Sequence, residues 1–196
     1  MTQIHRLLAL PLLLASAGCS NAVRNEHDAA LAYLGLDAGI TRAMNLGLDG
    51  YNAASSANID AQSAGGDIGG TMTVTGQVDQ GSSDNKELRL EVALEGYLDD
   101  TVDGDTPFEV TYDSDPQAPL ALDISLRDIP DGTLTGTFVG DVGISGDLGG
   151  IVSLDVALDG TIEAGVDDTV ARTEGETHIT GSATSDYGSY AIDLVR

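Results

Sequence analysis

The sequence predicts a mainly β fold: an antiparallel meander of about eight strands, forming a strongly curved sheet or open barrel with an N-terminal helical segment on its apolar face. Apolar and polar residues alternate along most of the chain after residue 69, which is typical of antiparallel strands with one solvated face. The connections are short and rich in Gly, Asp and Asn, which favours strands joined in sequence order. Before them, apolar residues recur every three to four positions, the period of a helix.

The charge balance excludes several classes of protein. The 196 residues include 32 acidic and 8 basic side chains, with a formal net charge of −24. A nucleic-acid-binding protein needs a basic surface, and so does a protein held on anionic lipid by charge alone. Because 41% of the residues are hydrophobic and many of them alternate, we expect a folded domain with an acidic surface, not a disordered chain.

The first twenty residues, MTQIHRLLALPLLLASAGCS, form a targeting signal. The apolar run over residues 7–17 is about half of the roughly 20 residues that span a bilayer, so it is interpreted as a secretory segment. Small residues then precede Cys19, and here the sequence resembles the signal of bacterial lipoproteins, whose lipobox ends in an obligatory cysteine. The family usually has Leu three residues before that cysteine, whereas this chain has Ser16.

This resemblance implies a membrane anchor at Cys19. Cleavage would follow Gly18, and Cys19 would carry acyl chains such as palmitate, two or three of which hold a protein firmly. In the family, Asp after the cysteine retains the protein at the inner membrane. Position 20 is Ser, so the outer membrane of the cell envelope is expected. Cys19 is the only cysteine, so an intramolecular disulfide is impossible.

Four segments are predicted: a signal peptide at 1–18, a tether at 19–27, a helical segment with a loop at 28–66, and an antiparallel β domain at 67–196. In the helical segment, Asp28 is the expected N-cap and Gly35 the expected break. One helix face carries Leu36, Ile40, Met44, Leu48 and Tyr51. Its many small residues either leave room for a ligand or let the helix approach the sheet closely.

The β domain has eight segments in which apolar residues occupy every second position or share one face. These lie at 72–78, 88–94, 108–112, 120–126, 134–142, 152–158, 179–183 and 190–194. The apolar face needs a cover, and the helical segment is the only other element able to provide it.

The chain lacks the residue patterns of common catalytic sites. Beyond the signal peptide only His27 and His178 remain, and two isolated histidines do not make a zinc site. There is no cysteine nucleophile, no Gly-x-Ser-x-Gly elbow and no phosphate-binding loop with its lysine. We therefore predict that the protein is not an enzyme and has no cofactor, apart from a possible calcium ion.

The calcium candidate is the acidic stretch Asp99, Asp100, Asp103 and Asp105. These four carboxylates surround a glycine in a turn, and calcium takes six to eight oxygen ligands. The stretch departs from the EF-hand loop, which requires a closing Glu. The alternative interpretation is an ordinary solvated acidic turn.

Two functions stay open at this point. The first is a non-catalytic envelope lipoprotein, anchored through acylated Cys19, with a structural or interaction role and an unknown protein partner. The second is a carrier that binds a lipid or other hydrophobic ligand between curved sheet and helix. The carrier requires an apolar cavity of several hundred Å³ under the helix.

Overall fold

The computed structural model describes residues 21–79 and 82–196. It contains one long helix, α1 (Glu26–Ala53), and one short 3₁₀ helix, η1 (Val166–Asp168). The strands are β1 (Asn58–Gly65), β2 (Gly69–Val78), β3 (Lys86–Leu98), β4 (Val102–Asp103), β5 (Thr106–Pro107), β6 (Val110–Asp113), β7 (Leu120–Arg127), β8 (Gly132–Gly146), β9 (Gly150–Ala164), β10 (Val170–Arg172), β11 (His178–Ser185) and β12 (Gly188–Val195).

The predicted antiparallel meander is confirmed. The described strands other than β4 and β5 form one sheet whose order is β1-β2-β3-β6-β8-β9-β11-β12, and every pairing in it is antiparallel. β6 and β7 both lie between β3 and β8, so they act as one strand that is interrupted at residues 114–119. Each of the eight predicted strand segments falls within or overlaps one of these strands.

One face of the sheet is apolar and the other is acidic. In β9 every second residue from Val152 to Leu158 is buried, whereas Asp155 and Asp159 point outward and are exposed. β3 and β7 follow the same pattern. This placement of charge is what a sheet with one solvated side requires.

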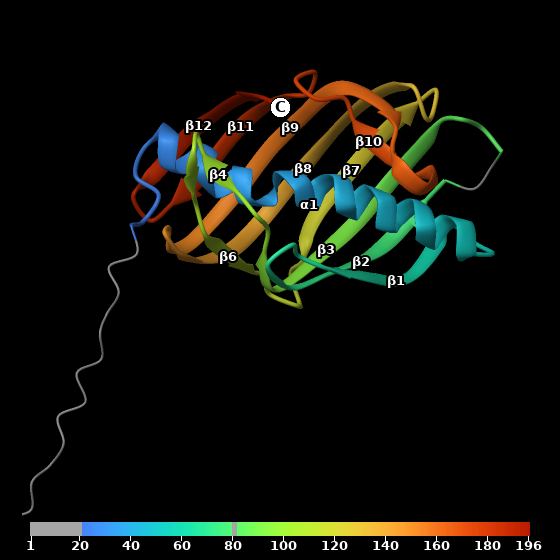
Figure 1. Cartoon of the computed structure of the whole chain (residues 1–196). Helices are drawn as coiled ribbons and strands as arrows, with labels where there is room; N and C mark the ends of the chain where they lie inside the picture. The colour runs from blue at the N-terminus through green and yellow to red at the C-terminus, as the bar shows by residue number, and fades with distance from the viewer. Residues whose placement is uncertain (1–20, 80–81) are drawn as a thin grey trace, which may run out of the picture.

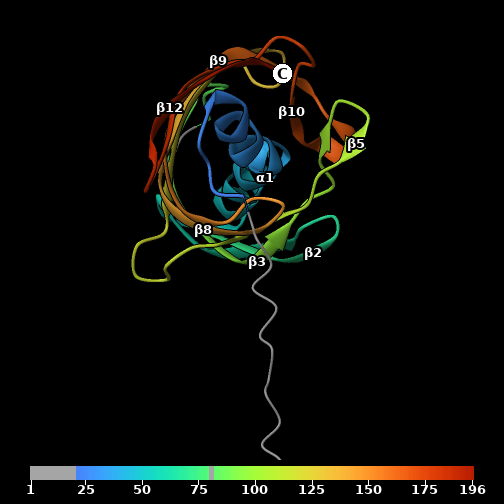
Figure 2. The same ribbon diagram turned by 90° about the vertical axis from the view of Figure 1, so that its left-hand side faces the viewer.

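The sheet curves around α1, which lies across its concave side (Figures 1 and 2). The helix contacts strands at both ends of the sheet, β1 and β12. Glycines allow the strands to bend: Gly76 and Gly181 have φ angles of 130° and 150°, where a side chain is strained. A Cβ at either position would also overlap a carbonyl oxygen of the neighbouring strand.

The helix begins two residues before its expected start and does not break. Asn25 is the N-cap: its Oδ1 accepts a hydrogen bond of 2.9 Å from the backbone N–H of Asp28. Asp28 in turn accepts hydrogen bonds from Arg24 N and Asn25 Nδ2 at 3.0 and 2.8 Å, a reciprocal arrangement like a capping box. The prediction of Asp28 as N-cap was therefore wrong by three positions. α1 also continues through Gly35, because this glycine serves packing against the sheet.

Small residues let the helix approach the sheet closely. Gly35, Gly39 and Gly47 all face sheet side chains. A Cβ on Gly35 would overlap the hydroxyl of Tyr112, and one on Gly39 would lie 3.0 Å from both Met72 and Tyr97. Close approach, one of the two predicted uses of these small residues, is the one that the structure contains.

Two predicted segments differ from the structure. Residues 58–65, predicted to belong to the helical segment and loop at 28–66, form the edge strand β1, whose single buried side chain, Ile59, leaves no alternating pattern to detect. The described part of the predicted tether is docked on the domain: Val23 is fully buried, and Asn21 forms a parallel bridge with Leu148. Ser185 Oγ also donates a hydrogen bond of 2.7 Å to the carbonyl oxygen of Val23.

An ion pair on the outer face allows a prediction about pH. The hydrogen bond from Arg127 lowers the pKa of Glu87 below its ordinary value of 4.5, and Ser125 donates a second hydrogen bond at 3.1 Å. A lowered native pKa means that the pair's small stabilisation is present above pH 4.5 and is lost as pH falls through the native pKa. In Arg127→Ala, the Glu87 pKa measured by NMR titration is expected to rise toward 4.5. An unchanged pKa in that variant would contradict the assignment.

Candidate functional site

The predicted lipidation residue, Cys19, and the predicted signal peptide at 1–18 lie outside the described residues. The described chain begins at Asn21, two positions later, where it is already bonded to the loop before β9: Gly149 N donates to Asn21 O at 3.1 Å. Within residues 21–79 and 82–196, no helix combines the length and apolar character needed to cross a bilayer. Lipidation at Cys19 stays a prediction.

The four candidate calcium ligands point to different partners. Asp99 is 2% exposed, and both its oxygens accept hydrogen bonds from Arg42 Nη1, at 2.8 and 3.0 Å. Asp103 lies 3.1 Å from His27 Nε2, while Asp100 and Asp105 are exposed. The described residues contain no group of three or more His, Cys, Asp or Glu placed to hold a metal. Calcium binding therefore stays a prediction without geometric support in this part of the chain.

Under the middle of α1, the interface with the sheet leaves little free space. The space bordered by Leu36, Ile40, Met72 and Phe138 has a volume of about 10 Å³. This is no more than about the 10–15 Å³ that a single water needs. An acyl chain needs far more, so the space under the helix gives the carrier hypothesis no support.

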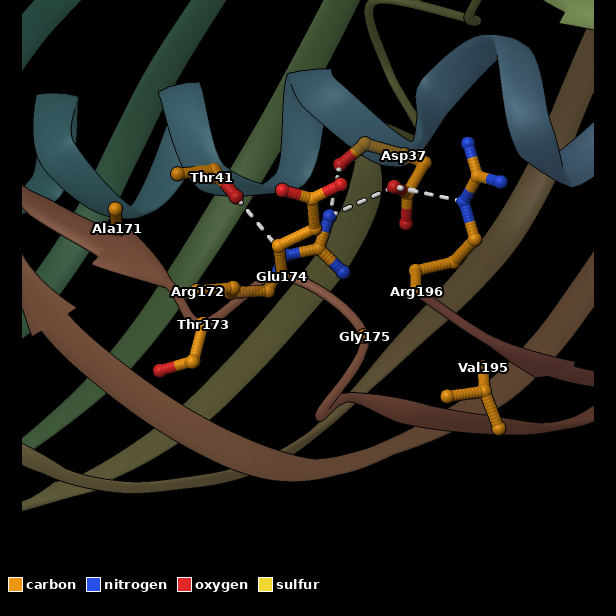
Figure 3. A pocket seen from close by; sticks show the side chains of 9 residues that line it. All are labelled: Asp37, Thr41, Ala171, Arg172, Thr173, Glu174, Gly175, Val195 and Arg196. Carbon is orange, nitrogen blue, oxygen red and sulfur yellow. Dashed lines mark hydrogen bonds and ion pairs between the residues drawn. The ribbon is translucent and has the colours of Figure 1, made fainter.

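A polar pocket lies beside the helix, where α1 meets β10 and the end of β12 (Figure 3). We name it the Arg172 pocket. Its volume is about 450 Å³. It is lined by Asp37, Thr41, Ala171, Arg172, Thr173, Glu174, Gly175, Val195 and Arg196.

Arg172 is held in place by the helix. Its Nε donates to Thr41 Oγ1 at 2.9 Å, and its Nη2 donates to the carbonyl oxygen of Asp37 at 2.9 Å. Nη2 also lies 2.9 Å from Asp37 Oδ2, in an ion pair whose side chains are only 9% and 13% exposed. The Nε of Arg196 approaches the same Oδ2 at 3.7 Å, so two arginines share one carboxylate.

One nitrogen of the Arg172 guanidinium has no hydrogen-bond acceptor among the described residues. Arg172 Nη1 is buried and has no hydrogen-bond partner in the described part of the chain. An unsatisfied buried donor costs about 1–3 kcal/mol, and more when the group is charged. The structure therefore contains a fixed, charged donor without an acceptor.

The groups around Asp37 keep Arg172 charged and Tyr33 protonated. Burial alone would lower the pKa of Arg172, but the hydrogen bonds and charge of Asp37 outweigh it and raise that pKa above its ordinary value. Burial and the charge of Asp37 raise the pKa of Tyr33 well above its ordinary value. Tyr33 thus stays protonated and donates to Asp37 Oδ1 at 2.8 Å. Both oxygens of Asp37 are occupied by groups of this chain.

Sequence reasoning missed the Arg172 pocket. Its members come from α1, from β10 and the loop after it, and from the end of β12 with Arg196, and nothing in their spacing brings them together. The only available signal was scarcity: the chain has 8 basic residues, so each deserves attention as a potential partner for buried acids. Pairing them with particular acids required the fold.

Comparisons with protein-family models, with curated proteins and with solved structures found no match.

Proposed function

We propose that the protein is a membrane-anchored, acidic lipoprotein of the cell envelope with a non-catalytic structural or interaction role. The lipobox-like segment that ends at Cys19 supports the anchor. The observation that carries the role is the small space under the middle of α1, which has a volume of about 10 Å³. In this proposal partners meet the outer surface of the domain, because the described space under the middle of α1 is too small for an acyl chain.

The outer surface has a consistent chemistry. Outward positions on β3, β7 and β9 carry Glu91, Glu95, Asp123, Asp155 and Asp159, all exposed. Carboxylates spread over a sheet surface repel other acidic surfaces and anionic lipid, and attract basic partners. In this proposal the acyl chains alone hold the domain at the membrane, and the acidic sheet surface faces away from the anionic lipid.

The contacts of the N-terminal segment with the domain limit how far an anchor at Cys19 could lie from the domain. Asn21, which is bonded to the loop before β9, lies two positions after Cys19. Two residues extend at most about 7 Å. An acylated Cys19 would therefore hold the domain directly against the bilayer, with little tether between them.

The anchor predicts a clear labelling result. The wild-type chain, expressed with an alkyne analogue of palmitate in a bacterium that processes lipoproteins, is expected to take up the label and enter the detergent phase. Cys19→Ser should abolish both, because Cys19 is the only thiol in the chain. Ser20→Ala is the matched control and should keep the label. An unlabelled wild-type protein would contradict the anchor.

A lipid-extraction experiment distinguishes the proposed structural or interaction role from the carrier alternative. Organic extraction of the purified protein followed by mass spectrometry should recover the covalently attached acyl groups only after hydrolysis. Recovery of a stoichiometric, non-covalent lipid would instead favour the carrier.

A further inference from the structure

The Arg172 pocket combines three properties of a binding site. The side chain of Arg172 is 9% exposed, and its Nη1 has no partner among the described residues. Figure 3 shows its guanidinium directed toward the space bordered by Gly175 and Arg196. That space belongs to a pocket of about 450 Å³, within the range of roughly 300–1,000 Å³ typical for small-molecule sites.

The positive charge in the pocket is only partly balanced by the groups bonded to it. Asp37 is in ion-pair contact with both Arg172 and Arg196, at 2.9 and 3.7 Å. Its other oxygen accepts from Tyr33. The side chain of Arg196 is 47% exposed, and its contact with Asp37 is through Nε. The two terminal nitrogens of Arg196 are therefore able to donate to a ligand.

We propose that the Arg172 pocket binds a small molecule through an oxyanion, a carboxylate or phosphate group, held between Arg172 Nη1 and the guanidinium of Arg196. Guanidinium groups offer paired N–H donors that match the oxygens of carboxylates and phosphates. Asp37 and Thr41 fix Arg172 before a ligand arrives, so little side-chain freedom is lost on binding. Ala171 and Val195 supply apolar contacts for the body of the ligand.

Glu174 sets the strength and selectivity of this site. It lines the pocket, and its negative charge opposes an anion. A ligand with an additional positive group would relieve that repulsion, whereas a bare anion would not. Bare anions are therefore expected to bind weakly, and removing the charge of Glu174 should strengthen their binding.

The test uses the purified full chain and two probes, inorganic phosphate and citrate, titrated by calorimetry at constant ionic strength against sodium chloride. Saturable binding of one equivalent in the millimolar range is expected for at least one probe. The stronger of the two identifies the preferred oxyanion. Glu174→Gln should tighten this binding several-fold, and Arg196→Ala should weaken it at least tenfold.

The controls distinguish binding of the anion in the Arg172 pocket from non-specific attraction of the anion to any arginine. Arg127→Ala removes an arginine from the outer face of the sheet, where it pairs with Glu87, and should leave the affinity unchanged. Arg196 has a half-exposed side chain, so its loss should preserve the fold, checked by circular dichroism. The proposal is overturned if neither probe binds the wild-type protein or Glu174→Gln saturably. Equal losses of affinity in Arg196→Ala and Arg127→Ala would also overturn it.

Discussion

Replacing Asp99 with Asn is expected to lower the free energy of unfolding by about 3 kcal/mol, the lower end of the range for breaking a buried ion pair. Asp99 is 2% exposed and accepts four hydrogen bonds, from Arg42 Nη1 twice, from the Tyr97 hydroxyl at 2.5 Å and from Asp67 N at 2.9 Å. An amide of the same shape has one acceptor oxygen, and its NH₂ group would face donors. Arg42 keeps its contact with Asp67, which limits the loss.

Urea denaturation of the wild type and the variant measures this loss, and Asp67→Asn provides the matched control. Asp67 binds the same guanidinium at 2.8 Å, but its side chain is 54% exposed. Exposed pairs contribute about 0–1 kcal/mol, so the control should be nearly as stable as the wild type. Equal effects in the two variants would contradict a special role for burial at Asp99.

Replacing Gly35 with Ala is expected to lower the free energy of unfolding by about 2 kcal/mol. Ala is favoured over Gly inside a helix by about 1 kcal/mol. Overpacking a full core costs up to about 3 kcal/mol, and here the new methyl group would overlap the hydroxyl of Tyr112 and lie 2.8 Å from its ring. Tyr112 is fully buried and donates to the carbonyl oxygen of Ala32 at 3.1 Å, so moving its ring away would cost this hydrogen bond.

Gly47→Ala in the same helix is the control for this second variant. The nearest atoms to a Cβ at Gly47 are the methyl groups of Leu90, at 2.9 and 3.1 Å, and these can rotate away. The gain in helix propensity should offset most of that adjustment, so the stability should stay within about 1 kcal/mol of the wild type. If Gly35→Ala were as stable as Gly47→Ala, the close contact between α1 and Tyr112 at Gly35 would be contradicted.

The candidate sites show where sequence reasoning ends. Asp99 belongs to an acidic stretch, and acidic stretches in turns predict calcium or solvent. Its burial beside Arg42, 57 positions away, depends on where β3 passes under α1. Likewise, Arg172 and Asp37 are 135 positions apart, and only the return of the chain along β10 brings them together.

The fold class, the eight predicted strand segments and the outward position of the acids on those strands follow from the sequence, because alternation within one strand is a local property. The tertiary structure alone decided how the small residues of α1 are used, that residues 58–65 form an edge strand, and which acids meet which arginines. These depend on the distance between elements and on the curvature of the sheet, which place residues far apart in the chain in contact. Such contacts leave no periodic trace in the sequence, since each partner is chosen by shape and charge in three dimensions.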